Sequence, residues 1–296
     1  MKNHIVSKRH AEMLIMALGA DIIGFLEDVS VTEVMLNSDG RLWVEKYDEG
    51  KIFSGIFIEK ERAANIIKLL AAMQQKIINH ACPELACEIE EFGVRFQGWF
   101  PPVVKAATFS MRKVASRIFS LNDYRASAAI TEKQAEQVRL AIKERKNILI
   151  AGGSGSGKTT FANALLHELE LSLDRIIILE DLPELQIKAK NCVRLISNEN
   201  VSMRSLVKSA MRMRPDRIIV GEVRDGSALE LLKAWNTGHP GGICTVHANS
   251  CGSALARLED LAHEAAGAIP VRLVSEAINL VIFMRNHSVA AIEEFE

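Results

Sequence analysis

The sequence predicts an α/β protein with two domains, in which a smaller α+β domain precedes a larger domain with a twisted, mostly parallel sheet. A chain of 296 residues is longer than one hydrophobic core usually needs, so two domains are the default expectation. Near residue 115 the pattern changes from strands and tight turns to buried strands that alternate with helices. We therefore expect domains at 1–115 and 131–296, joined by a polar, Ser/Ala-rich linker at 116–130.

The first domain is predicted to be rich in antiparallel strands. The Asp39-Gly40 and Glu49-Gly50 steps provide the positive φ angles that tight hairpin turns require. Pro101-Pro102 ends a later hairpin, because proline cannot donate a hydrogen bond to a strand ladder. The expected elements are a short helix within 10–27, a three-stranded meander over 33–58, a helix over 59–78, a hairpin over 85–100 and a strand over 108–113.

The second domain is predicted to contain a sheet with helices on both faces. Thr131 is a suitable N-terminal cap for its first helix. Uninterrupted apolar runs such as 148–151 are typical of parallel strands that are covered on both sides. The expected strands are 148–151, 175–179, 193–197, 217–221 and 243–246, and the expected helices are 131–146, 158–170, 202–213, 226–236 and 252–264.

Composition excludes several classes of protein. The formal net charge of −1, without a basic stretch interleaved with aromatic residues, argues against a nucleic-acid-binding surface. No apolar run approaches the roughly 20 residues of a membrane span, and the N-terminus begins an amphipathic pattern instead of a signal peptide. The 5 cysteines form no C-x-x-C pair, which argues against a zinc ribbon or a disulfide framework and favours a reducing cytoplasm.

A phosphate-binding motif occupies residues 152–159. Gly152, Gly157, Lys158 and Thr159 match the pattern G-x-x-x-x-G-K-[S/T]. A simple Gly/Ser-rich turn is the alternative, but a buried strand precedes the motif and a helix follows it, as phosphate binding requires. The sequence therefore predicts that the chain binds a nucleoside triphosphate. The expected nucleotide-binding residues are Gly153, Ser154, Gly155, Ser156, Gly157, Lys158, Thr159 and Thr160.

Acidic residues at strand ends are the candidates for metal binding and for activation of water. Glu222 follows an apolar strand, at the same expected sheet edge as the phosphate loop, and is our first candidate for orienting the attacking water. Many ATPases have a Mg²⁺-binding Asp at the position of Gly221. Without it, we expect Mg²⁺ to be held by Thr159, Glu180 and Glu222, although the segment 180–184 could instead be an exposed acidic turn and Glu222 a solvated acid.

Two histidines and several arginines complete the candidate site. His247 lies at the expected carboxyl end of a strand, where it could contact the γ-phosphate, and His239 lies in a Gly/Pro-rich loop. Without further spaced ligands, a zinc site is not expected here. An arginine near the γ-phosphate would assist hydrolysis, but each arginine between Arg204 and Arg224 could equally lie on a solvated surface.

Taken together and in this order, these segments resemble the secretion ATPase superfamily, the motors of type II secretion, type IV secretion and retractable pili. Gly221 agrees with this family's atypical Walker B motif, which also lacks the usual Asp. First-domain segments resemble its conjugal-transfer branch, so the resemblance covers nearly the whole chain. The matching segments are 152–159 (Walker A), 180–184 (Asp box), 214–224 (Walker B), 237–250 (His box), 36–44 and 101–102.

The resemblance implies a homohexameric ring in which a RecA-like P-loop domain and the first domain clamp ATP and Mg²⁺ between them. By position, Arg95 and Arg112 match first-domain arginines of the family, so Arg95 is expected to bind nucleotide and Arg112 to assist catalysis. The chain lacks the four-cysteine zinc module of the type II branch and a long N-terminal extension. The catalytic residues implied are Lys158, Glu184, Glu222, His247 and Arg112.

The function predicted is that of a Mg²⁺-dependent ATPase, a motor of a conjugative type IV secretion system. It would act with inner-membrane components at the cytoplasmic face of that membrane, with peripheral membrane contact and no sequence-specific nucleic-acid binding. The alternatives are a pilus-retraction or type II secretion ATPase, a scaffold that binds ATP without turnover, and a nucleic-acid translocase, which the balanced charge disfavours.

Overall fold

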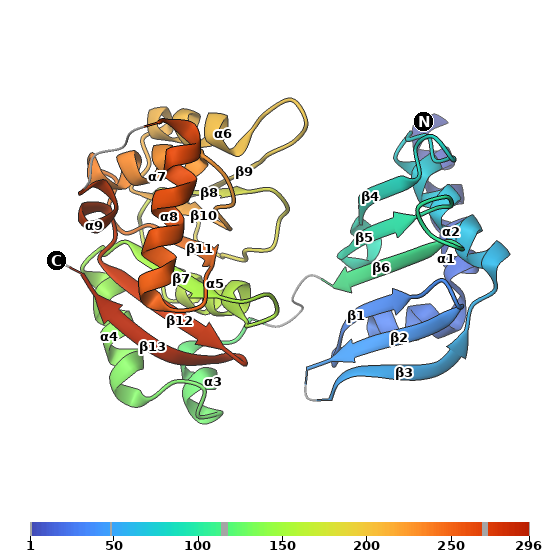
Figure 1. The fold of residues 1–296 in the computed structure, drawn as a ribbon, viewed down its shortest axis with the longest axis horizontal. Helices are drawn as coiled ribbons and strands as arrows, with labels where there is room; N and C mark the ends of the chain where they lie inside the picture. The colour runs from blue at the N-terminus through green and yellow to red at the C-terminus, as the bar shows by residue number, and fades with distance from the viewer. Residues whose placement is uncertain (1, 48, 114–117, 268–271, 296) are drawn as a thin grey trace. The chain divides into compact units, whose positions relative to one another are not determined.

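The protein consists of two compact units, Met1–Ser116 and Arg117–Glu296, each with a sheet of its own (Figure 1). The structure is a computed structural model and describes residues 2–47, 49–113, 118–267 and 272–295. Within these ranges it contains the α-helices, strands and short 3-10 segments named below.

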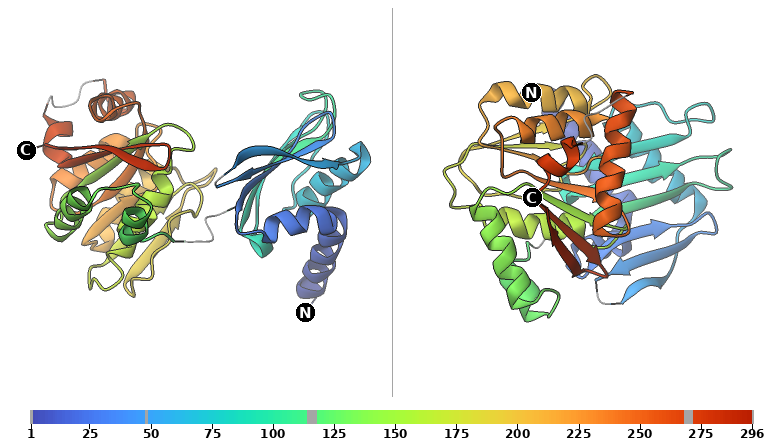
Figure 2. Two further views of the ribbon diagram at one scale, coloured as in Figure 1. Left: turned by 90° about the horizontal axis from the view of Figure 1, so that it is seen from below. Right: turned by 60° about the vertical axis from the view of Figure 1, so that its left-hand side comes forward.

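The first unit is a six-stranded antiparallel sheet with helices on one face (Figures 1 and 2). Its strands lie in the order β3-β2-β1-β6-β5-β4. Alternate residues such as Val34, Val44 and Met111 are buried against the helices, as expected for a sheet with one covered face. Its elements are α1 (Lys2–Glu27), β1 (Val31–Leu36), β2 (Arg41–Lys46), β3 (Gly50–Phe57), α2 (Lys60–Met73), β4 (Glu84–Ile89), η1 (Glu90–Phe92), β5 (Val94–Trp99) and β6 (Thr108–Lys113).

The second unit is built on a seven-stranded sheet in the order β13-β12-β7-β11-β10-β8-β9. All neighbouring strands are parallel except β12 and β13, which form an antiparallel hairpin. The predicted mostly parallel sheet is therefore confirmed. Its strands are β7 (Ile148–Gly152), β8 (Ile176–Glu180), β9 (Cys192–Ile196), β10 (Arg217–Val220), β11 (Ile243–His247), β12 (Leu280–Arg285) and β13 (Ser288–Glu294).

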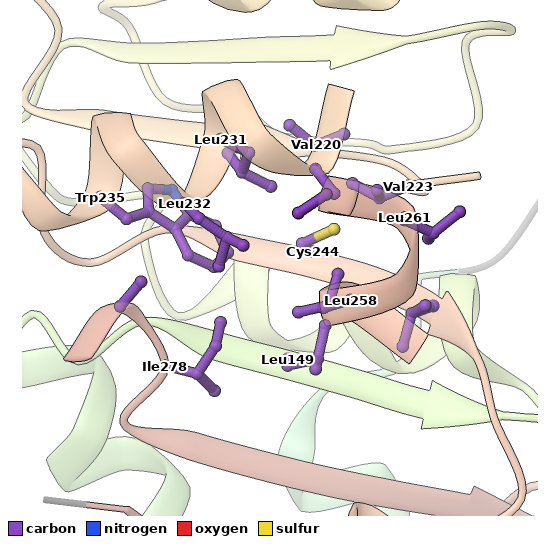
Figure 3. Close-up of a cluster of buried hydrophobic side chains, with 14 of the residues drawn as sticks. Leu149, Val220, Val223, Leu231, Leu232, Trp235, Cys244, Leu258, Leu261 and Ile278 are labelled. Carbon is purple, nitrogen blue, oxygen red and sulfur yellow. The ribbon is translucent and has the colours of Figure 1, made fainter. Parts of the chain in front are cut away.

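Helices cover both faces of this sheet because its central strands are apolar on both sides. Leu149 and Ala151 pack into one core, whereas Ile148 and Ile150 of the same strand pack into the other. Figure 3 shows the first of these cores, in which Trp235 donates a hydrogen bond from its indole nitrogen to the Ile218 carbonyl oxygen at 3.1 Å. One face carries α6 (Met203–Ala210) with η2 (Met211–Met213), α7 (Ser227–Asn236), α8 (Cys251–Ala265) and α9 (Leu273–Ala277), and the other carries α3 (Leu121–Ala126), α4 (Glu132–Lys143) and α5 (Lys158–His167).

The structure corrects one expectation about chain organisation and adds an element that was not predicted. The predicted linker 116–130, of which 116 and 117 lie outside the described residues, contains α3. Ser120 caps this helix, and Leu121, Tyr124 and Ile130 are buried in the core of the second unit, so the segment belongs to that unit. The hairpin β12–β13 was not predicted, because its turn at Asn286 and His287 has positive φ at both residues without the glycine that usually marks such turns.

Candidate functional site

The phosphate loop joins β7 to α5 and can close around an anion because its glycines lack side chains. Gly155 and Gly157 have φ angles of 69° and 94°, in the region that favours glycine. A Cβ atom at Gly152 would come within 2.7 Å of the Met284 carbonyl oxygen, so no larger residue fits there. The loop leads directly into the N-terminus of α5, where backbone N–H groups and the helix dipole favour a phosphate.

Four adjacent strands bring the candidate residues to the same sheet edge. The strands β7, β11, β10 and β8 are parallel neighbours, so their carboxyl ends lie together. His247 at the end of β11 is the direct register partner of Gly152. Glu222 follows β10, and Glu180 ends β8.

Lys158, His247 and Glu222 form one continuous chain of polar contacts. Lys158 Nζ donates to the carbonyl oxygens of Gly152 and Gly153, both at 3.0 Å, and lies 3.3 Å from His247 Nδ1. The other ring nitrogen, Nε2, is 2.7 Å from Glu222 Oε1. Burial and the neighbouring Lys158 ammonium lower the pKa of His247, which therefore favours the neutral imidazole at neutral pH.

Arg224 extends this chain on the far side of Glu222. Its Nε and Nη2 atoms donate to Glu222 Oε2 at 2.8 and 2.5 Å. The Glu222 side chain is 16% exposed, whereas that of Arg224 is 63% exposed, so a largely buried carboxylate is paired with an exposed arginine. Glu222 is therefore positioned by two cationic or polar neighbours instead of being a freely solvated acid.

Glu184 and Glu180 both lie near the loop but have different surroundings. Thr159 Oγ1 donates to Glu184 Oε2 at 3.4 Å, which places a hydroxyl and a carboxylate together at the start of α5. Glu180 is 2% exposed, and its Oε1 accepts hydrogen bonds from the backbone N–H groups of Glu184 and Leu185. Burial raises the pKa of Glu180.

The glycine at position 221 is explained by its neighbour Glu180. A Cβ atom on Gly221 would lie 3.1 Å from Glu180 Cγ and 3.5 Å from its Oε1. A side chain at position 221 would therefore crowd the Glu180 side chain of the adjacent strand. The sequence indicated that the usual Asp was missing, and the structure shows what lies in its place.

The model of the family described as "Type II/IV secretion system protein" matches residues 19–289 of this chain. The chain belongs to this family. It is 45% identical over 268 residues to the conjugal transfer protein TrbB of Rhizobium radiobacter, covering 90% of this chain and 83% of that protein. The resemblance inferred from the motifs, including that to the conjugal-transfer branch, is thus confirmed.

Solved structures of the family show the same fold. The VirB11 ATPase of the Brucella suis type IV secretion system, in complex with sulphate, aligns with a TM-score of 0.51 at 23% identity, covering 98% of this chain and 96% of that one. The pilus retraction motor PilT with bound ADP aligns with a TM-score of 0.63 at 20% identity, covering 90% and 77%. The predicted fold class is confirmed.

The residues predicted to form the nucleotide site do not all lie in one unit. Arg95 and Arg112 are cross-strand partners on β5 and β6 of the first unit, so their part in the nucleotide site stays a prediction. His239 lies before β11, at the opposite end of that strand from the phosphate loop, with Nδ1 3.2 Å from the Ala234 carbonyl oxygen. A role for His239 at the phosphates is not supported by this position.

Sequence reasoning missed Asn163 and His287, which contact the site, and assigned no specific role to Arg224. Asn163 of α5 is buried and hydrogen-bonded to the segment that carries Glu184. The backbone N–H of His287 donates to the Ser156 carbonyl oxygen at 3.1 Å, so the hairpin β12–β13 braces the phosphate loop. Arg224 was noted only as one of several arginines. The family's Walker B pattern pointed to Arg224, but no motif pointed to Asn163 or His287.

The described residues contain no helix that is long and apolar enough to cross a membrane.

Proposed function

We propose that this chain is an ATP-hydrolysing motor of a conjugative type IV secretion system. The observation that carries the ATPase assignment is the contact chain from Lys158 through His247 to Glu222, which links a phosphate cradle to a candidate for water activation. The conjugative assignment is supported by the 45% identity to TrbB over most of both chains. The likeness to PilT, at 20% identity, supports pilus retraction less well.

The binding of ATP would rearrange this contact chain. In the present structure the Lys158 ammonium is hydrogen-bonded to carbonyl oxygens of its own loop, and a bound phosphate would compete for that ammonium. His247 would then be released from Lys158 and could face the γ-phosphate. Glu222 would orient the attacking water, and its contact with Arg224 would set the direction of the carboxylate.

The donor set at the start of α5 fits a Mg²⁺ ion, which supplies charge neutralisation for phosphoryl transfer. A threonine hydroxyl and a carboxylate are hard oxygen ligands of the kind Mg²⁺ prefers, and Thr159 and Glu184 present them side by side. We propose that these two residues hold the ion. Glu222 would contact the ion through water. One oxygen of Glu180 already accepts hydrogen bonds from two backbone N–H groups, which makes Glu180 a weaker candidate for a metal ligand than the sequence suggested.

The proposed assembly is a homohexamer at the cytoplasmic side of the inner membrane, where ATP is available and the other secretion components lie. The first unit would supply Arg95 and Arg112 to the nucleotide and contribute to contacts in the ring. The family membership supports this assembly. Native mass measurement with and without ATP and Mg²⁺ tests it, since a strict monomer under both conditions would contradict a shared site.

Two substitutions test the catalytic assignment. Lys158→Ala removes the charge that neutralises the phosphates and is expected to abolish both tight ATP binding and turnover. Glu222→Gln keeps the size of the side chain, so ATP binding is expected to persist while hydrolysis falls by about 10² or more. Steady-state phosphate release and nucleotide-binding measurements check both. Hydrolysis at the wild-type rate in Glu222→Gln would refute the role of Glu222.

A further inference from the structure

The loop after β8, at residues 181–186, is hydrogen-bonded to two buried polar side chains, one on each side. No sequence motif linked these two side chains to each other. Asn163 on α5 and Glu180 at the end of β8 are each 2% exposed. Between them lies Glu184, whose carboxylate is the group that meets Thr159. The two buried residues come from different elements, so their contacts with one short segment fix that segment relative to both the helix and the sheet.

Each side of the Glu184 peptide has its own partner. Glu180 Oε1 accepts from the N–H of Glu184 at 2.8 Å and from the N–H of Leu185 at 2.7 Å. Asn163 Nδ2 donates to the Glu184 carbonyl oxygen at 3.2 Å, and Asn163 Oδ1 accepts from the N–H of Gln186 at 2.7 Å. The backbone of Glu184 is therefore hydrogen-bonded through both its donor and its acceptor.

Such an arrangement restricts the Glu184 side chain far more than a surface loop would. Without these bonds, the buried N–H of Leu185 and partly buried backbone groups of Glu184 and Gln186 would lose their partners, which is costly, so the observed conformation is favoured. Leu185, the next residue, is 1% exposed and packs into the core beneath the loop. The carboxylate of Glu184 is thereby directed at the first turn of α5, where Thr159 begins the helix.

We propose that Asn163 and Glu180 are positioning residues that hold Glu184 against Thr159, so that the two oxygen ligands are arranged for Mg²⁺ before the ion binds. This inference rests on the proposed function, because it takes nucleotide-bound Mg²⁺ as the ion that Glu184 serves. It assigns Glu180 a structural contact through one acceptor oxygen in place of the direct metal ligation expected from the sequence. Partners that orient metal ligands commonly affect metal affinity 10- to 100-fold.

Two variants distinguish the positioning of Glu184 by hydrogen bonds from an effect of the charge of Glu180. Asn163→Leu keeps a side chain of similar size but removes the bonds to Glu184 and Gln186. Glu180→Gln retains an acceptor oxygen for the N–H groups of Glu184 and Leu185 while removing the charge. Leu166→Ala is the control for a general loss of packing, since Leu166 is a buried residue of the same helix that takes no part in these hydrogen bonds.

The first measurement is amide hydrogen exchange in the full-length protein. Asn163→Leu is expected to speed exchange at the Gln186 amide by about tenfold, the change associated with the loss of one backbone hydrogen bond. Glu180→Gln is expected to leave exchange at Glu184 and Leu185 within about twofold, because its acceptor oxygen remains. The control is expected to leave all three amides unchanged.

The second measurement is the effect of Mg²⁺ on ADP affinity, determined by calorimetry. Asn163→Leu is expected to raise the half-saturating Mg²⁺ concentration by about tenfold with Mg²⁺-free ADP binding unchanged. Glu180→Gln is expected to resemble the wild type, whereas Glu184→Gln should lose most of the Mg²⁺ effect. If Asn163→Leu does not fold, Glu180→Leu takes its place, because it removes the acceptor of the Glu184 and Leu185 N–H groups and is expected to raise the half-saturating Mg²⁺ concentration about tenfold.

Three results would overturn the inference: a wild-type Mg²⁺ response in Asn163→Leu, a loss in Glu180→Gln as large as that in Glu184→Gln, or no effect of Mg²⁺ on ADP binding by the wild type. A failure of the proposed function looks different. In that case the wild type releases no phosphate, whereas the exchange rates and the Mg²⁺ dependence of ADP binding still report on the contacts of Asn163 and Glu180.

Discussion

At the scale of single residues, the protonation of His247 follows from its two neighbours. The Lys158 ammonium can only donate, so His247 Nδ1 must accept from it, and the ring proton then lies on Nε2 facing Glu222. Sequence position alone predicted that His247 would lie beside the phosphate loop. It could not predict the tautomer, which depends on the strand register that pairs His247 with Gly152.

These neighbours shift the pKa of His247 in opposite directions, which gives a prediction with a definite sign. Burial and Lys158 lower this pKa, whereas Glu222 raises it. We expect the His247 ring to titrate below its ordinary value of 6.5 in an NMR experiment. Lys158→Ala should move the midpoint up, and Glu222→Gln should move it further down. Shifts of the same sign in both variants, or a wild-type midpoint above the ordinary value, would contradict the contact chain.

Gly221 provides a second residue-scale prediction, because a side chain there would be in tight contact with Glu180. The side chain of Asp at position 221 would overlap the space of Glu180 and bring two carboxylates together. We expect Gly221→Asp to lower the free energy of unfolding by about 1–3 kcal/mol, as overpacked sites do, and not to improve Mg²⁺ binding. Denaturant unfolding and Mg²⁺ titration measure these two quantities.

Gly252 is the matched control for this substitution. It lies in the first turn of α8 with an ordinary φ angle, and a Cβ atom there would meet no atom within 4 Å. Gly252→Ala is therefore expected to stabilise the protein by about 0.4–1 kcal/mol, because alanine lowers the conformational entropy of the unfolded chain. Equal stability of Gly221→Asp and the wild type would show that the space beside Glu180 is open.

At the scale of elements, periodicity predicted nearly every strand and helix up to residue 265, because buried strands and amphipathic helices leave a pattern in the sequence. The hairpin β12–β13 was not predicted, although Leu280 to Met284 is an apolar run, because its turn lacks glycine. Missing the hairpin also meant missing its contact with the phosphate loop through His287. Local patterns indicate elements, but contacts between distant elements depend on the sheet order.

The contribution of the contacts at the kink in α1 to the stability of the protein can be tested. Gly19 has φ 64° and interrupts the helix, and Arg62 of α2 donates to the carbonyl oxygens of Ala17 and Leu18 at 3.0 and 2.5 Å. Arg62 also pairs with Asp21 at 2.5 Å and thereby lowers the pKa of that carboxyl group. One guanidinium thus ties the end of the first helical segment to the neighbouring helix.

We expect Arg62→Met to lower the free energy of unfolding by about 1–3 kcal/mol, since it removes the guanidinium that pairs with helix-end carbonyls and with the partly buried Asp21 carboxylate. Arg41→Met is the control, because its pair with Asp39 is about half exposed and should contribute less than about 1 kcal/mol. The pKa of Asp21 is depressed, so the contribution of its pair is present above the ordinary value of 3.8 and is lost as pH falls below it. Urea unfolding near neutral pH measures both variants, and equal effects would refute this role of Arg62.

At the scale of the whole molecule, the two units have separate hydrophobic cores. The core of the first unit consists of residues between Leu14 and Met111, and the two cores of the second consist of residues between Leu121 and Val289. The change of pattern in the sequence indicated this division near residue 115. It could not show that 118–130 packs with the second unit, because a Ser/Ala-rich segment gives little periodic signal.

Separate cores predict two unfolding transitions on heating, and the 3 tryptophans can assign them. Trp43 and Trp99 belong to the first unit, and Trp235 belongs to the second. Trp235→Phe leaves fluorescence from the first unit, and a double Trp43→Phe/Trp99→Phe variant leaves it from the second. ADP with Mg²⁺ at 100 times Kd is expected to stabilise the second unit by about 2.7 kcal/mol.

The response of the first unit to nucleotide then decides whether the site is shared between units. If Arg95 and Arg112 reach the phosphates, ATP with Mg²⁺ will also raise the transition reported by Trp43 and Trp99, and Arg112→Ala will reduce that increase while leaving the Trp235 response largely intact. Arg41→Ala, a change of the same kind at the Asp39 pair of the same sheet, should leave both responses intact. A rise confined to the second unit in the wild type would mean that nucleotide is bound without the first-unit arginines, since a ligand stabilises only what it contacts or what is coupled to its site.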